Sequence, residues 1–171
     1  MFMIDYSTPD KAEGIVKEVY SMFPAHIAVP DPLQLFSASP RYLSREAGVI
    51  KDFMGDDAYD PGFLAALRYI GASTFCFDAC TVFNKDYLLR MGLSEEEIDS
   101  LTSNPAQSFE DKEAALITFV AKSTTNPDGV SRADIDAVRA QGWTDQQIFE
   151  CTVYAARMAT VGQVFRTFSE K

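Results

Sequence analysis

Basic residues and long hydrophobic runs are both scarce in this chain. Its 171 residues include 15 lysines and arginines against 25 aspartates and glutamates, which gives a formal net charge of −10 at pH 7. Binding to nucleic acid or to an anionic membrane surface needs a basic surface, so we expect neither partner. The unbroken apolar runs are far shorter than the ~20 residues of a membrane helix, and we expect no membrane span.

Cysteine and histidine are also rare, with three cysteines and one histidine in the chain. An odd number of cysteines without an extracellular spacing pattern is typical of a reducing compartment. The N-terminus lacks the basic region and the long apolar core of a secretory signal, so we expect a cytoplasmic protein. The cysteine spacing suits zinc poorly, and no Gly-rich phosphate-binding loop occurs. We therefore expect neither a metal nor an organic cofactor.

The pattern that is present is helical. Apolar residues recur at spacings of three and four, and no convincing alternation typical of strands occurs. Four helix starts are predicted where a capping residue precedes proline, at Thr8-Pro9, Asp31-Pro32, Ser39-Pro40 and Asp60-Pro61. The sequence predicts an all-α bundle of about eight helices in a single domain. Residues 1–58 are predicted to form an N-terminal helical extension packed on a core of residues 59–171.

Two junctions in the second half share one pattern of capping residues. Gly92 suits the left-handed position after a helix, and Ser94 with Glu97 predicts a capping box. The segment from Gly142 repeats this order, with Thr144 and Gln147 as the box. Helices are predicted over residues 108–122, 131–141 and 145–168.

The residues from Phe63 to the C-terminus resemble the AhpD-like family, also called the carboxymuconolactone decarboxylase superfamily. The family signature is Cys-x-x-Cys-x-x-x-His at a helix start, followed by a Gly-x-Ser/Thr junction. Cys80, Asn84 and Gly92-Leu93-Ser94 hold the register of the second cysteine, the histidine and that junction. The N-terminal portion is similar to the longer, peroxidase-related branch. The resemblance implies an AhpD-like helical bundle that assembles as a homo-oligomer: a dimer, a trimer or a hexamer.

The resemblance also implies an antioxidant oxidoreductase activity, the thiol-dependent reduction of alkyl hydroperoxides. In the family the second cysteine attacks the peroxide, while the histidine and an upstream glutamate relay protons that favour its thiolate. Here Phe77 stands at the first cysteine position, Asn84 at the histidine position and Ala65 at the glutamate position. Cys80 alone remains, so we expect the family activity to be weak, altered or lost.

Cys76 lies four residues before Cys80, so the two share a face of a regular helix. Their Cβ atoms would be ~5–6 Å apart there, whereas a disulfide needs ~3.5–4.5 Å. A bond would therefore require the helix to begin between them, for example with Asp78 as its cap. One interpretation is a displaced redox pair, with Cys80 attacking and Cys76 resolving. The other is two small buried thiols.

Four further residues are candidates for lining a substrate pocket. Phe77 could plug or line it, and Asn84 could hydrogen-bond a ligand or satisfy buried backbone. Asp78 could accept a proton or, as an N-cap or first-turn carboxylate, interact with the helix dipole. His26 could fold over the thiols and replace the lost base, or it could be an ordinary surface histidine.

Arg68 and Arg157 are expected near this segment by analogy with the family. The simplest expectation for them is surface or interface ion pairs, and the alternative is pairing with a ligand carboxylate. Three functional hypotheses follow: a divergent hydroperoxide reductase, a noncatalytic or small-ligand-binding protein, and a thiol-independent, decarboxylase-like enzyme acting on a small carboxylic acid.

Overall fold

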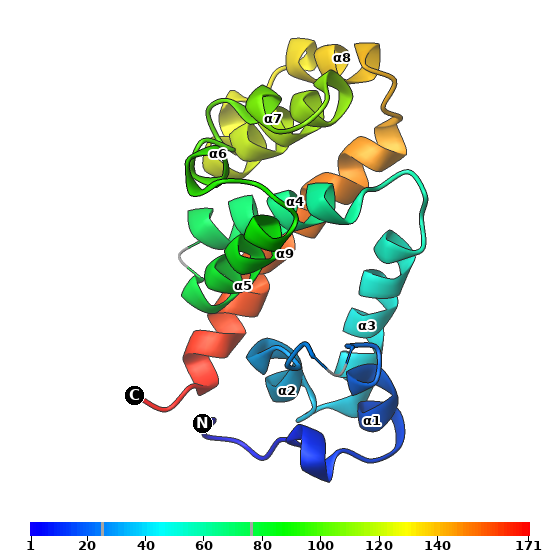
Figure 1. Ribbon diagram of the computed structural model, residues 1–171, viewed down its shortest axis with the longest axis vertical. Coiled ribbons are helices and arrows are strands. Elements are labelled where there is room, and N and C mark those ends of the chain that lie inside the picture. Colours follow the sequence, from blue (N-terminus) through cyan, green and yellow to red (C-terminus); the bar gives the residue numbers. More distant parts are fainter. Residues whose placement is uncertain (25, 76) are drawn as a thin grey trace. The chain divides into compact units, whose positions relative to one another are not determined.

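The computed structural model describes residues 1–24, 26–75 and 77–171, with the side chain of residue 106 left aside. Helices make up its regular structure (Figure 1), and the described residues contain no strand, only an isolated bridge between Phe2 and Ser169. This confirms the predicted all-α class. The α-helices of the described residues are α1 (Gly14–Tyr20), α2 (Asp31–Phe36), α3 (Pro40–Met54), α4 (Pro61–Thr74), α5 (Asp78–Arg90), α6 (Glu95–Asp99), α7 (Asp111–Thr125), α8 (Arg132–Ala140) and α9 (Asp145–Phe168).

Short 3-10 turns supplement these helices at η1 (Pro9–Lys11), η2 (Pro105–Gln107) and η3 (Pro127–Gly129). Ser39 and Asp60 cap their helices as predicted, since each side chain accepts a hydrogen bond from the first turn. Thr8 instead precedes a 3-10 turn without a capping bond, and α2 begins at Asp31 itself. Among the described residues no helix is long and apolar enough to cross a membrane.

Two compact units make up the chain. One comprises Met1–Tyr59 together with Gln163–Lys171, and the other comprises Asp60–Gly162. The last residues of α9 therefore group with the N-terminal helices. The packing of the N-terminal extension on the core stays a prediction.

The first unit is built from α1, α2 and α3, which pack around Val19, Leu35 and Leu43. The two ends of the chain are tied together in it. The amide of Met3 donates to the carbonyl of Phe168 at 2.8 Å, and the ring of Phe2 meets Phe165 edge-on at 5.4 Å. The unit therefore closes through contacts between its terminal segments.

The second unit has α4 at its centre, in contact with α5 and α7. This helix is apolar almost all round, which is typical of a buried helix, and its residues from Phe63 to Leu67 are at most 1% exposed. Trp143, which precedes α9, stacks on Phe63 with ring centroids 5.6 Å apart. Helix α5, which carries Cys80, belongs to this unit and packs on α4.

Both predicted junctions of the second unit are confirmed. Gly92 and Gly142 have φ angles of 101° and 88°, which glycine adopts without steric cost. Ser94 and Glu97 form a complete capping box. Thr144 and Gln147 exchange the equivalent bonds at 3.1 and 3.2 Å.

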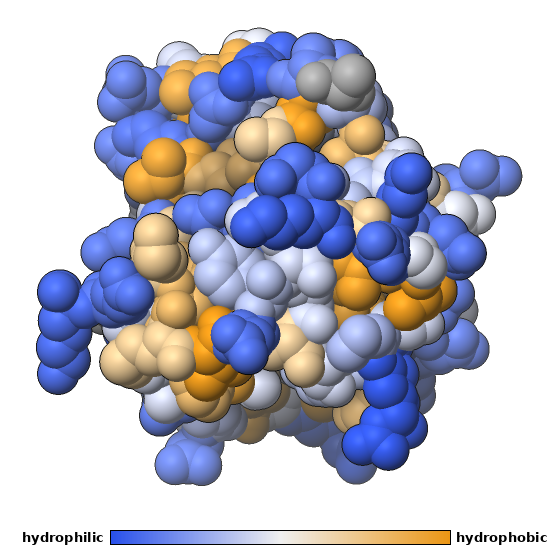
Figure 2. All heavy atoms as spheres, turned by 90° about the horizontal axis from the view of Figure 1, so that it is seen from below, coloured by the Kyte–Doolittle hydropathy of each residue, from blue (hydrophilic) through white to orange (hydrophobic). Residues whose placement is uncertain are grey.

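Several large hydrophobic side chains lie at the surface rather than in the core. Figure 2 shows one face of the molecule, on which separate hydrophobic patches lie among hydrophilic side chains. The most exposed of these residues away from the N-terminus are Met54, Val82 and Phe149, at 64%, 67% and 70%. Isolated apolar residues of this kind are common on protein surfaces, so only their grouping on one helix face carries information.

Candidate functional site

Cys80 lies in the first turn of α5, on a face that is neither fully buried nor fully exposed, and its thiol is free. Burial raises the pKa of the Cys80 thiol to about 12, and the positive charge of Arg68 opposes this rise only in part. The thiol is therefore protonated at neutral pH. Cys76 lies outside the described residues, so its pairing with Cys80 stays a prediction.

Asn84 occupies the position of the family histidine, one helical turn after Cys80, and is 1% exposed. Its amide nitrogen donates to the Cys80 carbonyl at 2.8 Å, and its Oδ1 accepts from Arg68 Nε at 2.8 Å. A buried amide needs such partners, because an unsatisfied polar group is costly. Asn84 is thus anchored at both ends of its amide and carries no group that titrates near neutral pH.

Arg68 connects α5 to α9. Its Nη1 donates to the hydroxyl of Tyr154, and its guanidinium carbon lies 5.6 Å from the centroid of that ring. We call Arg68 of α4, Asn84 of α5 and Tyr154 of α9 the Arg68 junction. In this junction the guanidinium of α4 donates hydrogen bonds to side chains of both α5 and α9.

The close approach of α4 and α9 makes this junction possible. A Cβ built on Gly71 would stand 2.2 Å from the carbonyl oxygen of Ala155, closer than any side chain tolerates. Glycine therefore lets the two backbones nearly touch one turn from Arg68, and Tyr154 comes within reach of its guanidinium. A larger residue at position 71 would separate the helices.

No carboxylate lies within ion-pair distance of Arg68 among the described residues, so the expected surface ion pair does not form there. Its partners Asn84 and Tyr154 are both neutral. The contact between Arg68 and Tyr154 could not be predicted from the sequence, because the two residues are 86 positions apart. The small residues Gly71 and Ala155 could have indicated a close helix crossing, but not which residues meet beside it.

Phe77 is 2% exposed and occupies the N-cap position of α5. Its carbonyl accepts from the Thr81 amide at 3.0 Å, and its amide donates to the Ala72 carbonyl at 2.8 Å. Of the two positions expected for Asp78, N-cap or first turn, the structure shows the first turn, because Phe77 holds the N-cap position. Asp78 is the first helical residue and is exposed, where its charge suits the helix dipole.

Ala65, at the position of the family glutamate, is fully buried in α4. His26 is exposed in the segment between α1 and α2 and belongs to the first unit, whereas Cys80 belongs to the second. A role for His26 as a replacement base stays a prediction. In the described part of the chain, no group of three or more His, Cys, Asp or Glu side chains could hold a metal ion.

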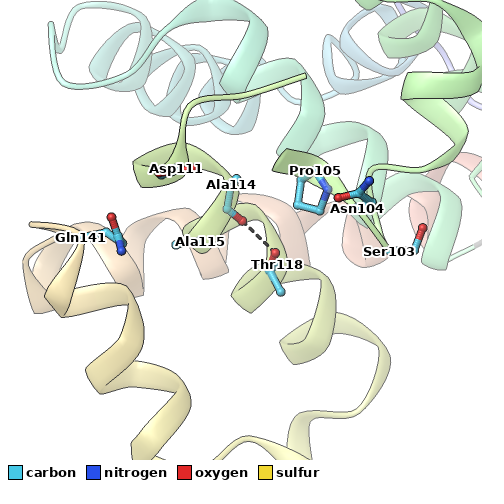
Figure 3. Close-up of a pocket in the computed structure, with 8 residues that line it drawn as sticks. All are labelled: Ser103, Asn104, Pro105, Asp111, Ala114, Ala115, Thr118 and Gln141. Carbon is cyan, nitrogen blue, oxygen red and sulfur yellow. Dashed lines mark hydrogen bonds between the residues drawn. The ribbon is translucent and has the colours of Figure 1, made fainter. Parts of the chain in front are cut away.

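One surface hollow of the described residues does not include Cys80. It has a volume of about 360 Å³ and opens beside the start of α7 (Figure 3), between Ser103, Asn104, Pro105, Asp111, Ala114, Ala115, Thr118 and Gln141. The other, of about 150 Å³, lies in the first unit between the chain ends, beside Phe2 and Phe165. Neither hollow is lined by the residues that the sequence predicts for a substrate pocket.

Two solved structures resemble the whole chain. One is an uncharacterised peroxidase-related protein from Silicibacter sp. TM1040, with a TM-score of 0.73 and 14% identity over 91% of this chain and 85% of that one. The other is described as an alkylhydroperoxidase AhpD core, an uncharacterised peroxidase-related protein from Ralstonia eutropha JMP134. Its TM-score is 0.75, with 14% identity over 98% of this chain and 90% of that one. The chain has an AhpD-like fold.

This AhpD-like fold confirms the resemblance drawn from the cysteine segment and the capped junctions. No protein-family model and no curated protein matches the sequence. At 14% identity the structural similarity concerns the fold and not the activity. What the chain does must therefore be argued from its own residues.

Proposed function

We propose that this AhpD-like protein is a noncatalytic homo-oligomer that has lost the thiol peroxidase activity of its fold family. The observation that carries the proposal is the pair of hydrogen bonds that Asn84, at the position of the family histidine, makes with Arg68 and with the Cys80 carbonyl. An amide locked between a guanidinium and a backbone carbonyl has no proton to relay. We keep the cytoplasmic location as a prediction from the cysteine usage.

The state of the thiol supports the same proposal. Peroxide reduction requires a thiolate, since the thiol itself is a poor nucleophile. With a pKa of about 12 for Cys80, the thiol is almost entirely protonated at pH 7, because the ionised fraction falls with each pH unit below the pKa. Nothing polar replaces the lost glutamate at Ala65, which is fully buried.

Thiol counting tests this proposal. Native protein is exposed to a small excess of cumene hydroperoxide at pH 7, and its free thiols are counted after unfolding, against the three cysteines of the sequence. We expect the count to stay unchanged in the wild type and to stay one lower in Cys80→Ser with and without peroxide. Rapid loss of thiols in the wild type that Cys80→Ser abolishes would overturn the proposal.

The second candidate function is a slow reaction of the Cys80 thiol with peroxides. The partial exposure of Cys80 beside the positive charge of Arg68 favours it. The pH dependence of Cys80 alkylation distinguishes a slow reaction of this thiol from a noncatalytic protein. A thiol with a pKa of about 12 should react faster with every pH unit up to pH 10, without a plateau. A plateau near pH 8 would show that the thiolate is accessible at neutral pH and would support the slow reaction.

The proposed homo-oligomer is supported by one face of α9. Phe149 and Val153 are 70% and 42% exposed, and Ala156 is exposed as well. Spacings of four and three residues place these side chains on one face of the helix. An apolar stripe of this kind suits contact with a second copy of the chain, as the family resemblance implies.

Light scattering after size exclusion tests the role of this face. We expect Phe149→Glu to lower the oligomer mass, because the new charge would be buried against an apolar partner surface. Met54→Glu is the matched control, since Met54 is similarly exposed but lies on α3. An unchanged mass for Phe149→Glu would exclude this face as the interface.

A further inference from the structure

Arg68 is a half-buried cation whose protein partners are both neutral. Its guanidinium donates to Asn84 and Tyr154, and no Asp or Glu of the described residues pairs with it. An arginine stays charged at any physiological pH. Partial burial of a charge costs free energy unless an opposite charge compensates it. Arg68 therefore retains the capacity to bind one negative charge.

The third nitrogen of this guanidinium is available. Nη2 makes no hydrogen bond with the described residues, and no fully buried side-chain nitrogen or oxygen among them lacks a partner. Nη2 is therefore not fully buried, which leaves it able to donate to an incoming ligand. Asn84 and Tyr154 hold the rest of the group in place, so little side-chain freedom would be lost on binding.

Cys80 adjoins the Arg68 junction, because its backbone carbonyl accepts from the Asn84 amide. It is one helical turn before Asn84, on the same face of α5, and Asn84 in turn accepts from Arg68 at 2.8 Å. The charge of Arg68 is felt at the thiol. Cys80 as a residue is partly exposed.

We propose that Arg68 binds the carboxylate of a small monocarboxylic acid at the surface beside Cys80. One guanidinium compensates one negative charge, and the net charge of −10 of the chain opposes the approach of multiply charged anions. A planar guanidinium also matches the geometry of a carboxylate. The proposal goes beyond the proposed function and holds whether or not Cys80 reacts with peroxides.

Two alkylating reagents of nearly equal size test the site. Iodoacetate carries a carboxylate and iodoacetamide does not, and both react when the thiolate displaces iodide. Both rates at Cys80 depend equally on the fraction of thiolate, so this fraction drops out of their ratio. The ratio therefore measures how strongly the protein attracts the carboxylate of iodoacetate. The measurement is made in a Cys76→Ser background, and Cys151 is fully buried.

We expect Arg68→Gln to lower the iodoacetate-to-iodoacetamide ratio by about threefold or more, in the range of a partly exposed ion pair. Arg90→Gln is the matched control, since it removes the same charge from α5, the helix that carries Cys80, at an exposed ion pair with Asp86. That variant should leave the ratio unchanged. An equal ratio in wild type and Arg68→Gln, or an equal fall in both variants, would overturn the proposal.

A competition experiment with Arg68 unchanged tests the site even if Arg68→Gln misfolds. In the Cys76→Ser background, millimolar acetate or benzoate should slow iodoacetate while leaving the iodoacetamide rate unchanged, and sodium chloride at the same ionic strength should not. Slowing of both reagents alike, or of neither, would contradict a carboxylate site at Arg68. Arg68→Lys should keep part of the discrimination, because it preserves the charge but not the fork of donors.

Discussion

The Arg68 junction and the capped turns at Gly92 and Gly142 join helices of the same unit by opposite means. In the turns, exposed side chains satisfy backbone groups three residues away. In the junction, a half-buried guanidinium ties together side chains from three separate helices. The turns depend on local chemistry and the junction on a close helix crossing. Substitutions should therefore cost far more at the junction.

The largest effect is expected at the crossing itself. Gly71→Ala would force α4 and α9 apart, because the new Cβ would lie 2.2 Å from the Ala155 carbonyl oxygen. We expect a loss of about 3 kcal/mol in the free energy of unfolding, at the upper end for overpacking, measured by urea denaturation.

Gly48→Ala is the control for that variant. Gly48 lies in α3, where an added Cβ would meet nothing within 4 Å. Alanine there should be neutral or should stabilise by up to about 1 kcal/mol through helix propensity. Equal effects at positions 71 and 48 would show that the two backbones do not approach as closely as the structure has them.

A smaller effect is expected from removing one partner of the junction. Asn84→Ala would leave Nε of the half-buried Arg68 without its acceptor, at a cost of about 2 kcal/mol. Ser94→Ala removes an exposed cap and should cost about 1 kcal/mol. Urea denaturation of both variants under one set of conditions gives the comparison. A larger loss for Ser94→Ala than for Asn84→Ala would reverse the proposed ranking of junction and turn.

The same contrast explains what could be predicted from the sequence. The turns at Gly92 and Gly142 were predictable because each capping bond joins residues close in the chain. The contact between Arg68 and Tyr154 was not, since a single sequence does not pair residues 86 positions apart. The sequence left Asp78 as either the N-cap or a first-turn residue of α5, and the backbone places Phe77 at the cap and Asp78 in the first turn. The sequence shows that Asn84 replaces the family histidine. It does not show that the guanidinium of Arg68 hydrogen-bonds Asn84.

The smallest expected effects concern two glutamates of this unit whose pKa values move in opposite directions. Hydrogen bonds from the backbone and side chain of Ser94 and from Ser108 lower the pKa of Glu97 from its ordinary value of 4.5. Burial, and then the charges of Asp60 and Glu110, raise the pKa of Glu113. Ionised Glu97 therefore stabilises the fold and ionised Glu113 destabilises it.

The contributions of Glu97 and Glu113 to the free energy of unfolding can be distinguished by urea denaturation at several pH values. The stability contributed by Glu97 is fully present above pH 4.5 and is lost as the pH falls through its lowered pKa, so Glu97→Gln should be destabilising at pH 7 and progressively less so in acid. Glu113→Gln should instead be stabilising at pH 7, and this gain should vanish as the pH falls below 4.5, where the wild-type carboxyl is protonated in both states. Glutamine can still serve in the capping box, so Glu97→Gln mainly removes the charge. Effects of the same sign for both variants at pH 7 would contradict the opposed environments of the two carboxylates.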